Sequence, residues 1–571
     1  MGKLRVLAVL VLIVILLSGC AGDKAKQATG IFISGQYGGD AESLNLLLVA
    51  DGTSFSYIGL TLDSLAIYNN KLETHLLCLA KDVEVSPDGL VYTITIRDDL
   101  KWSDGSQVTA EDYVYTLQNL MFSDWLNYPY KGDWQEQVDG KTVYVTPQTV
   151  NATTFTITRQ TVDPEFVYRI YNLIPYPKYI ATKYEGDVEA FTRAPEFNNL
   201  TYTGNLGPYK FKEWIRNDRF VVERNPDYYL GKPVGAPYFQ QYVVKLFGNS
   251  ATMLAALEAG DITMAGIEPE KVSKFKNIKN INVYTVPSGG YTLMGYNHRA
   301  NGWEGLKKKE IRQAISMAIS KDTICKSVYY GFAEPAYSFI PVTSPWYTAD
   351  TVVKYGVGSL YDKKKAAELF QQAGYGKKKP DGAIEVVGKD GRPLKLVLVT
   401  TTGGGLAEDV AYLIRQELAA LGIEVELKLV PWEVLVRKYL MNKVPGSNQP
   451  PRHNGGMEAV SEEPWDLVLM AFGTDIMAPS GSVFFTTNGG LNFFGYSNPK
   501  IDELFERVKT KEALDKQVRR NIYGEISHIL SEEQPVDFLV FRLGNYGFQK
   551  NVKGIEPGIS MGYNSYLWYF E

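Results

Sequence analysis

A helix that runs directly into a strand near residue 420 constrains the fold more than any other feature of the sequence. Apolar residues recur at helical spacing over residues 410–421, Gly422 ends the helix, and apolar residues then alternate over residues 423–429. A helix followed at once by a strand is a unit of a mixed α/β sheet. Strand and helix signals alternate in this way from Ile31 onward, so the sequence predicts an α/β fold.

Further segments have clear local patterns. Residues 83–96 alternate in polarity around a Pro-Asp-Gly turn, which predicts a β-hairpin. Residues 109–112 approximate a capping box and open a helix, and amphipathic helices are predicted at 311–319 and 362–373. Residues 444–463 contain three prolines and a Gly-Gly pair with no apolar period, which predicts a long mobile loop.

Length and charge exclude several classes of function. A chain of 571 residues is long enough for three or four compact units. Its net charge of −5 lacks the basic excess that nucleic-acid binding needs, so no nucleic-acid partner is expected. Only four His and three Cys are present, which leaves few residues for metal or thiol chemistry, and no cofactor is expected. Aromatic residues make up 13% of the chain, and 38 of them are Tyr.

Catalytic motifs are almost absent from the sequence. Residues 558–562 match the Gly-x-Ser-x-Gly of a hydrolase nucleophile, but the base His of that fold follows the Ser, and no His lies beyond His528. The match is therefore interpreted as accidental. No phosphate-binding loop and no His-Glu-x-x-His is present. A pair of catalytic carboxylates stays open among 64 acidic residues, but the chain is not expected to be an enzyme.

The N-terminus carries an export signal. Lys3 and Arg5 precede an apolar run over residues 6–17, which is too short to span a bilayer and is typical of a signal peptide. The Leu-Ser-Gly-Cys that ends at Cys20 resembles the lipobox of bacterial lipoproteins, in which the Cys sulfur is lipidated.

This resemblance implies a signal peptide at residues 1–19 and a lipidated tether at residues 20–30. It places the protein on the extracytoplasmic face of the cell membrane, at the cell surface or in the periplasm, held by its lipid anchor. Cys78 and Cys325 then remain as thiols outside the cytoplasm. They either pair or, as the slightly favoured alternative, stay buried and free.

Seven or more segments, in order along nearly the whole mature chain, resemble the large extracytoplasmic solute-binding proteins of the peptide, oligopeptide and nickel class, which feed ABC importers. The segments are residues 97–112, Gly207-Pro208-Tyr209 with Trp214, residues 225–229, residues 257–262, residues 294–297, residues 311–321, Ala373-Gly374-Tyr375, residues 418–425 and residues 495–499 with Asp502. Each is weak alone, and most have a structural interpretation as turns or strand entries. Because the segments occur in the right order, the sequence resembles family 5 of the solute-binding proteins of ABC importers.

The resemblance implies a periplasmic-binding-protein-like fold of type II, cluster C, with two α/β lobes, a hinge and an extra inserted α/β domain. Lobe I is expected to comprise residues 31–70, 201–290 and 536–571, the extra domain residues 71–200, and lobe II residues 291–535. Ligand would bind between the lobes, and closure would bury it. The expected monomer would then dock on the permease subunits of an ABC importer, whose cytoplasmic ATPases supply the energy.

Asp475 is the main candidate for binding. In peptide-binding members an aspartate at this motif position pairs with the α-ammonium of the ligand, which implies that role for Asp475. A cleft that closes over an ammonium must supply a counter-charge. The alternative is that Asp475 only caps the following turn. Peptide binders usually continue with Asp-Pro, whereas Pro479 is retained here without a second acid.

Aromatic residues are the other candidates for the wall of the cleft. Trp432 matches a family position where an aromatic often lines the cleft, although core packing is an equal alternative. Tyr37, just after the first strand, and Trp465 are further wall candidates. Residues 444–463 are expected to form a rim that restricts or extends the ligand.

The expected function is capture of oligopeptides for an ABC importer. The first alternative is the same receptor for an oligosaccharide or another small solute, with a nickel chelate less favoured because the chain has four His. The second is a surface enzyme or a signalling receptor without a role in transport.

Overall fold

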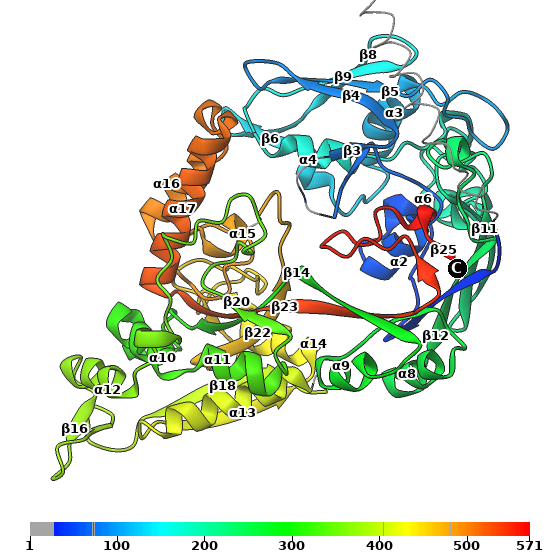
Figure 1. Ribbon diagram of the computed structural model, residues 1–571. Coiled ribbons are helices and arrows are strands. Elements are labelled where there is room, and N and C mark those ends of the chain that lie inside the picture. Colours follow the sequence, from blue (N-terminus) through cyan, green and yellow to red (C-terminus); the bar gives the residue numbers. More distant parts are fainter. Residues whose placement is uncertain (1–27, 71, 73–74, 404, 480) are drawn as a thin grey trace, which may run out of the picture.

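The computed structural model of the protein describes residues 28–70, 72, 75–403, 405–479 and 481–571 (Figure 1). The predicted signal peptide, the predicted lipidation site at Cys20 and most of the predicted tether lie outside the described residues.

One long mixed sheet organises the molecule. Its strand order is β10-β11-β12-β1-β13-β23-β14-β22-β18-β19, and β15 (Ala333–Pro335) pairs with β23. In that order the strands are β10 (Tyr209–Ile215), β11 (Arg219–Arg224), β12 (Gln241–Phe247), β1 (Ile31–Tyr37), β13 (Met264–Gly266), β23 (Val536–Gln549), β14 (Ile281–Tyr296), β22 (Leu467–Gly473), β18 (Lys395–Thr401) and β19 (Glu424–Val430). The α/β fold predicted from the alternating pattern is thereby confirmed.

Two long antiparallel strands, β14 and β23, join the two halves of this sheet (Figure 1). Their register shifts between Pro287 and Tyr291, and each strand continues into both halves. The predicted boundary at residues 290/291 therefore falls inside β14. It lies at the register shift where β14 and β23 pass from one half of the sheet to the other. The division into lobes stays a prediction, because the sheet itself is continuous.

The part of the main sheet in the predicted lobe II is covered on both faces. β22 directs Leu467 and Leu469 into one core and Val468 and Met470 into another, as alternation along a strand requires. Helices α10 (Lys309–Ala318), α12 (Lys363–Gln372) and α13 (Leu406–Ala419) cover the first face, and α16 (Pro499–Arg507) and α17 (Lys516–Glu533) cover the second. The helices predicted at 311–319, 362–373 and 410–421 are confirmed as α10, α12 and α13.

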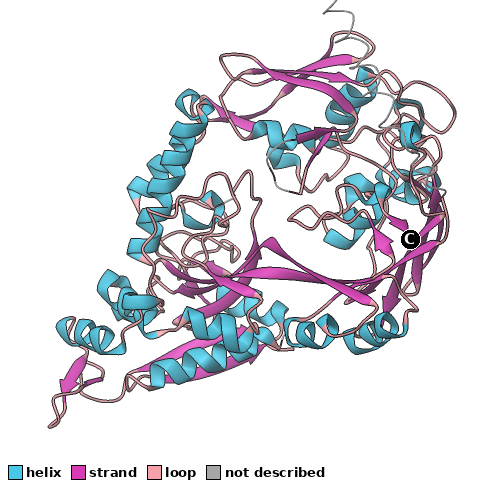
Figure 2. Cartoon of the chain, in the orientation of Figure 1, coloured by secondary structure: helices cyan, strands magenta, loops and turns pink. Residues whose placement is uncertain are grey.

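A second sheet stands apart from the main one (Figure 2). It has four strands in the order β4 (Ala80–Val85), β5 (Val91–Ile96), β9 (Thr154–Thr158) and β8 (Thr146–Thr149). The predicted hairpin is confirmed as β4 and β5, joined by a turn in which Gly89 takes a φ of +75°. The predicted capping box is also confirmed, since Thr109 and Asp112 cap α3 (Ala110–Tyr115).

Shorter elements complete the described chain. Between residues 52 and 198 these are α2 (Gly52–Ile58), β2 (Ala66–Tyr68), β3 (His75–Leu77), β6 (Gln135–Val138), β7 (Lys141–Tyr144), α4 (Phe166–Tyr171), α5 (Lys178–Ala181), α6 (Val188–Arg193) and α7 (Pro195–Asn198). Elsewhere lie α8 (Ser250–Ala259), α9 (Pro269–Lys276), α11 (Lys321–Thr323), β16 (Gly376–Lys378), β17 (Ile384–Val386), α14 (Trp432–Val434), β20 (Asn442–Lys443), β21 (Val460–Ser461), α15 (Ser482–Phe485), β24 (Val552–Lys553) and β25 (Tyr569–Phe570).

Hydrogen bonds tie down the segment 444–463, which the sequence predicts to be a long loop. Its end forms β21, which pairs with β20, so the prediction misses a short strand. The buried side chain of Arg299 donates to the Asn454 amide oxygen and to the Gly456 carbonyl. A local pattern could not reveal this, because Arg299 lies far away in sequence. The mobility of the segment stays a prediction.

The two described cysteines are buried and free, as the sequence slightly favours. Cys78 packs in a core formed by residues 41–244, and Cys325 packs in the core of lobe II. The first of these cores contains residues from both sides of the predicted boundary at 70/71 and of that at 200/201. Lobe I and the predicted extra domain are therefore packed against each other through a common core.

Candidate ligand-binding site

Parallel strands of lobe II deliver two of the predicted residues to one edge of the sheet. β18 runs parallel to both β19 and β22. Trp432 follows the end of β19, and Asp475 follows the end of β22. Binding residues of α/β sheets commonly lie at the carboxyl ends of such strands. Tyr37 ends β1, which runs parallel to β12 in the other half of the sheet.

Asp475 is exposed, and its carboxylate already caps a turn. Its Oδ1 accepts hydrogen bonds from the backbone N–H of Met477 at 2.8 Å and of Ala478 at 3.1 Å. The side chain also faces the other half of the molecule: burial and then the nearby Asp475 carboxylate raise the pKa of Tyr68. Asp475 thus caps the turn that follows it, as the alternative interpretation expects. Its carboxylate also lies close enough to Tyr68 of β2 to affect the pKa of that phenol.

The three aromatic candidates have different surroundings. Trp465 is 2% exposed and packs in the core beneath α16 and α17, which corrects the expectation that it lines the cleft. Trp432 is 54% exposed, so the core alternative does not apply to it. The Tyr37 hydroxyl contacts Glu268, and burial together with that carboxylate raises the pKa of Tyr37 to about 12.

The principal cavity lies against lobe I and the predicted extra domain. Its volume is 1140 Å³, above the ~300–1000 Å³ of ordinary small-molecule pockets. Its wall comes from segments within 46–68, 121–134, 169–174, 286–289 and 558–568, together with single residues of the sheet. None of Tyr37, Trp432, Trp465 and Asp475 is among the described lining residues.

Aromatic rings dominate the wall of this cavity. Twelve aromatic side chains are among its described lining residues, and nine of these are tyrosines, including Tyr128, Tyr130, Tyr563 and Tyr566. The Tyr surplus of the composition thus contributes directly to the wall of this cavity. Pairs such as Tyr128 with Tyr130 are visible in the sequence, but nothing local distinguishes them from ordinary core aromatics.

Asp63 is one of three charged residues among the described lining residues, with Asp133 and Arg169. Its Oδ2 accepts hydrogen bonds from the hydroxyls of Tyr228 and Tyr229, both at 2.8 Å. Burial raises the pKa of Asp63 to about 6, and the two phenols oppose that rise. The Asp63 carboxylate is therefore already hydrogen-bonded to two tyrosines of the protein.

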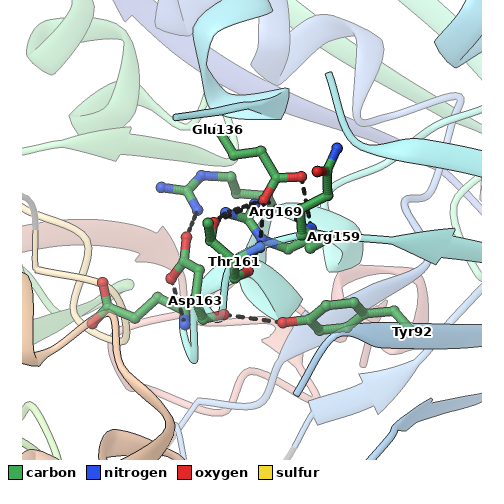
Figure 3. Close-up of polar contacts among 8 residues, drawn as sticks. Tyr92, Glu136, Arg159, Thr161, Asp163 and Arg169 are labelled. Atoms are coloured by element: carbon green, nitrogen blue, oxygen red, sulfur yellow. Dashed lines mark hydrogen bonds and ion pairs between the residues drawn. The ribbon is translucent and has the colours of Figure 1, made fainter. Parts of the chain in front are cut away.

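A network of charged residues fixes the wall around Arg169 (Figure 3). The Arg169 Nη1 donates to Asp163 Oδ2 at 2.8 Å, and its Nε lies 3.9 Å from Asp133 Oδ1. Nearby, the buried Glu136 accepts hydrogen bonds from the backbone N–H of Thr161 and from its hydroxyl. These contacts hold the loop after β9 in one conformation and neutralise the guanidinium.

The same loop reaches lobe II on the side away from β14 and β23. Tyr523 of α17 donates a hydrogen bond to Glu165 Oε1 at 2.5 Å, and Arg519 Nη1 donates to the Pro164 carbonyl at 3.1 Å. We call these two hydrogen bonds the far-side contact. With β14 and β23 on one side and the far-side contact on the other, the two halves form a closed ring (Figure 1).

The motif at residues 558–562 has a structural role. All five residues line the cavity, and no His is among its described lining residues.

In the described part of the chain no group of three or more His, Cys, Asp or Glu is placed to hold a metal ion. Within that same part, no helix is both long enough and apolar enough to cross a bilayer.

Comparison with known proteins identifies the family. The sequence model of the bacterial extracellular solute-binding proteins, family 5, matches residues 77–492. The oligopeptide-binding protein AppA of Bacillus subtilis is 26% identical over 96% of this chain and 95% of its own. The dipeptide-binding protein of Lactococcus lactis is 26% identical over 82% of each chain.

Solved structures agree on the fold. The ABC transporter substrate-binding protein CtaP of Listeria monocytogenes superposes with a TM-score of 0.76 at 22% identity, covering 95% of this chain and all of that one. The AppA structure of Bacillus subtilis gives 0.70 at 24% identity, over 96% of this chain and all of its own. The fold is therefore the cluster C periplasmic-binding-protein fold, and the protein belongs to the bacterial extracellular solute-binding proteins, family 5.

Proposed function

We propose that the protein captures oligopeptides between its lobes and delivers them to the permease of an ABC importer. The observation that carries the proposal is the family match over residues 77–492 on a chain with a 1140 Å³ cavity. Relatives named as oligopeptide- and dipeptide-binding proteins support peptide as the ligand. The AppA structure of Bacillus subtilis was solved in complex with a nonapeptide, which also supports peptide as the ligand.

The proposed mechanism of capture follows from the two connections between the halves of the molecule. β14 and β23 act as the hinge, and the far-side contact forms when the lobes close. A peptide main chain satisfies its polar groups along strand ends, while its side chains enter the cavity. The closed form then docks on the permease. The chain has no phosphate-binding loop, so ATP hydrolysis belongs to the partner.

The N-terminal residues support attachment of this receptor to the membrane. We infer that cleavage before Cys20 and lipidation of its sulfur anchor the monomer on the extracytoplasmic face. The polar residues of the tether separate the folded part from the bilayer. Mass spectrometry of the intact protein from its host should give the mass of the lipidated chain that starts at Cys20, and an unmodified Cys20 would contradict the anchor.

Asp475 is proposed to bind the α-ammonium of the peptide. Replacing Asp475 with Asn keeps an oxygen for the turn but removes the charge, so affinity for a free-amine peptide should fall by about fivefold to tenfold. N-acetylated peptides should bind the variant and the unchanged protein equally. Calorimetry with both peptide sets measures this difference.

A matched control is Asp104→Asn, since Asp104 is also exposed and caps its own loop by accepting from the Ser106 N–H at 2.9 Å. That variant should bind all peptides normally. If Asp475→Asn leaves free-amine binding unchanged, its carboxylate serves the turn alone.

The ligand class itself is tested by native mass spectrometry of the protein purified from its host. Co-purified peptides are the expected result. A co-purified sugar or metal chelate in place of peptides would overturn the peptide proposal. A nickel chelate is the second candidate, because the NikZ structure of Campylobacter jejuni, solved with Ni(L-His), superposes with a TM-score of 0.69. An enzyme would instead convert the added ligand.

A further inference from the structure

We propose that the cavity against lobe I binds the uncharged apolar side chains of the peptide, so that the receptor selects peptides with bulky aromatic or aliphatic residues. This inference rests on the proposed function and specifies its substrate class. It concerns the cavity wall and not Asp475, which lies outside the described lining.

The wall offers mainly rings and aliphatic groups. Phe55 of α2, Ile67 of β2, Met264 of β13 and Trp568 near the C-terminus contribute from segments that are far apart in sequence. Apolar groups of a ligand gain by leaving water for such a wall, and aromatic rings add favourable ring contacts. A polar peptide would gain little there.

The charges on the wall are already satisfied by neighbouring protein groups. Asp63 is bonded by two tyrosine hydroxyls, and Arg169 is bonded to Asp163 and lies near Asp133. A charged side chain of the ligand would lose its water and would have to compete with these partners for a counter-charge. The wall therefore disfavours ligand Lys and Glu as well as favouring apolar groups.

The size of the cavity sets how much ligand it accepts. At 1140 Å³ it exceeds a single drug-sized pocket, so more than one side chain fits. Val286 and Gly289 of β14 contribute to its wall, which places the bound side chains beside the strand that joins the halves. The apolar part of the ligand therefore contacts the hinge itself.

The test uses calorimetry with peptides of one length that differ at a central position, which is Trp, Leu, Ala, Lys or Glu. We expect the Trp and Leu peptides to bind about tenfold or more tightly than the Lys and Glu peptides, as burial of one large apolar side chain predicts. Equal affinity across the set would overturn the inference while leaving peptide capture intact.

A cavity-filling variant locates the effect. Ser56 is exposed on α2 and lines the cavity, so Ser56→Trp should occupy part of it and reduce binding of the Trp peptide at least about fivefold, with a smaller effect on the Ala peptide. Ser273→Trp, on the exposed face of α9, is the matched control and should change neither. An equal loss for both peptides in Ser56→Trp would contradict the location.

An uncharged aromatic probe separates this inference from the proposed function. N-phenyl-1-naphthylamine should bind the unchanged protein with enhanced fluorescence and should bind the Ser56→Trp variant less. If every peptide fails to bind while the probe still responds to Ser56→Trp, peptide capture is overturned and the apolar cavity stands. If neither peptides nor the probe bind, both are overturned.

Discussion

Replacing Asp537 with Asn should lower the free energy of unfolding by ~3–5 kcal/mol, the usual loss when one partner of a buried ion pair is removed. The Asp537 Oδ1 lies 2.8 Å from Lys321 Nζ, and the two side chains are 0% and 1% exposed. The Lys321 ammonium also donates to the carbonyls of Ala336 and Phe538. The variant leaves that ammonium buried without a counter-charge.

Urea unfolding followed by circular dichroism measures this loss. Asp227→Asn is the matched control, because Asp227 pairs with Lys232 at 3.2 Å on the surface with side chains 60% and 66% exposed. The control should lose less than ~1 kcal/mol. Lys321→Met combined with Asp537→Leu should recover much of the loss, since apolar pairs replace buried ion pairs well. Equal losses in Asp537→Asn and Asp227→Asn would contradict the prediction.

Ligand affinity should fall as the pH rises from about 5 to about 8, because the proposed closure of the lobes would bury Glu165. Burial raises the pKa of Glu165 from 4.5 to about 7, with Asp163 adding to the rise and Tyr523, Arg519 and Arg169 opposing it. In the open form the side chain returns to water and to its ordinary pKa. The protonated acid therefore favours closure at low pH, and the carboxylate opposes it at high pH.

The difference between a pKa of 4.5 in the open form and about 7 in the closed form would weaken binding about 70-fold over this pH range. Because Glu165 is only half-buried, the expected loss is smaller, about tenfold or more. Glu165→Gln cannot ionise, so its affinity at high pH should match that of the unchanged protein at low pH. Calorimetry with one uncharged-side-chain peptide across the pH range measures both. An unaltered pH profile in Glu165→Gln would assign the dependence to another group.

Local order in this protein could be predicted from the sequence because local residues determine it. Gly422 ends α13 and permits β19 to begin, and Thr109 with Asp112 caps α3 within four residues. The family resemblance predicts the fold class, which the comparisons confirm. The cavity could not be predicted, since its wall combines segments as far apart in the 571-residue chain as Leu46 and Trp568.

The two tryptophan candidates show why side-chain burial could not be predicted. Trp465 precedes β22, a strand inside the sheet with helices on both faces, so its ring is enclosed. Trp432 follows β19, which ends the strand order, and its ring faces solvent. Position in a strand order is a property of long-range pairing, and the sequence around each Trp carries no record of it.

The common core of residues 41–244 reduces the number of parts that can move. A chain with two lobes and an inserted domain would ordinarily have three bodies, but a domain that shares its core with a lobe cannot rotate against it without exposing apolar surface. In the proposed mechanism, opening should therefore have one principal coordinate, the angle between two rigid bodies. A single fluorophore pair that spans the far-side contact should report the whole motion, because no third body can move independently of that distance.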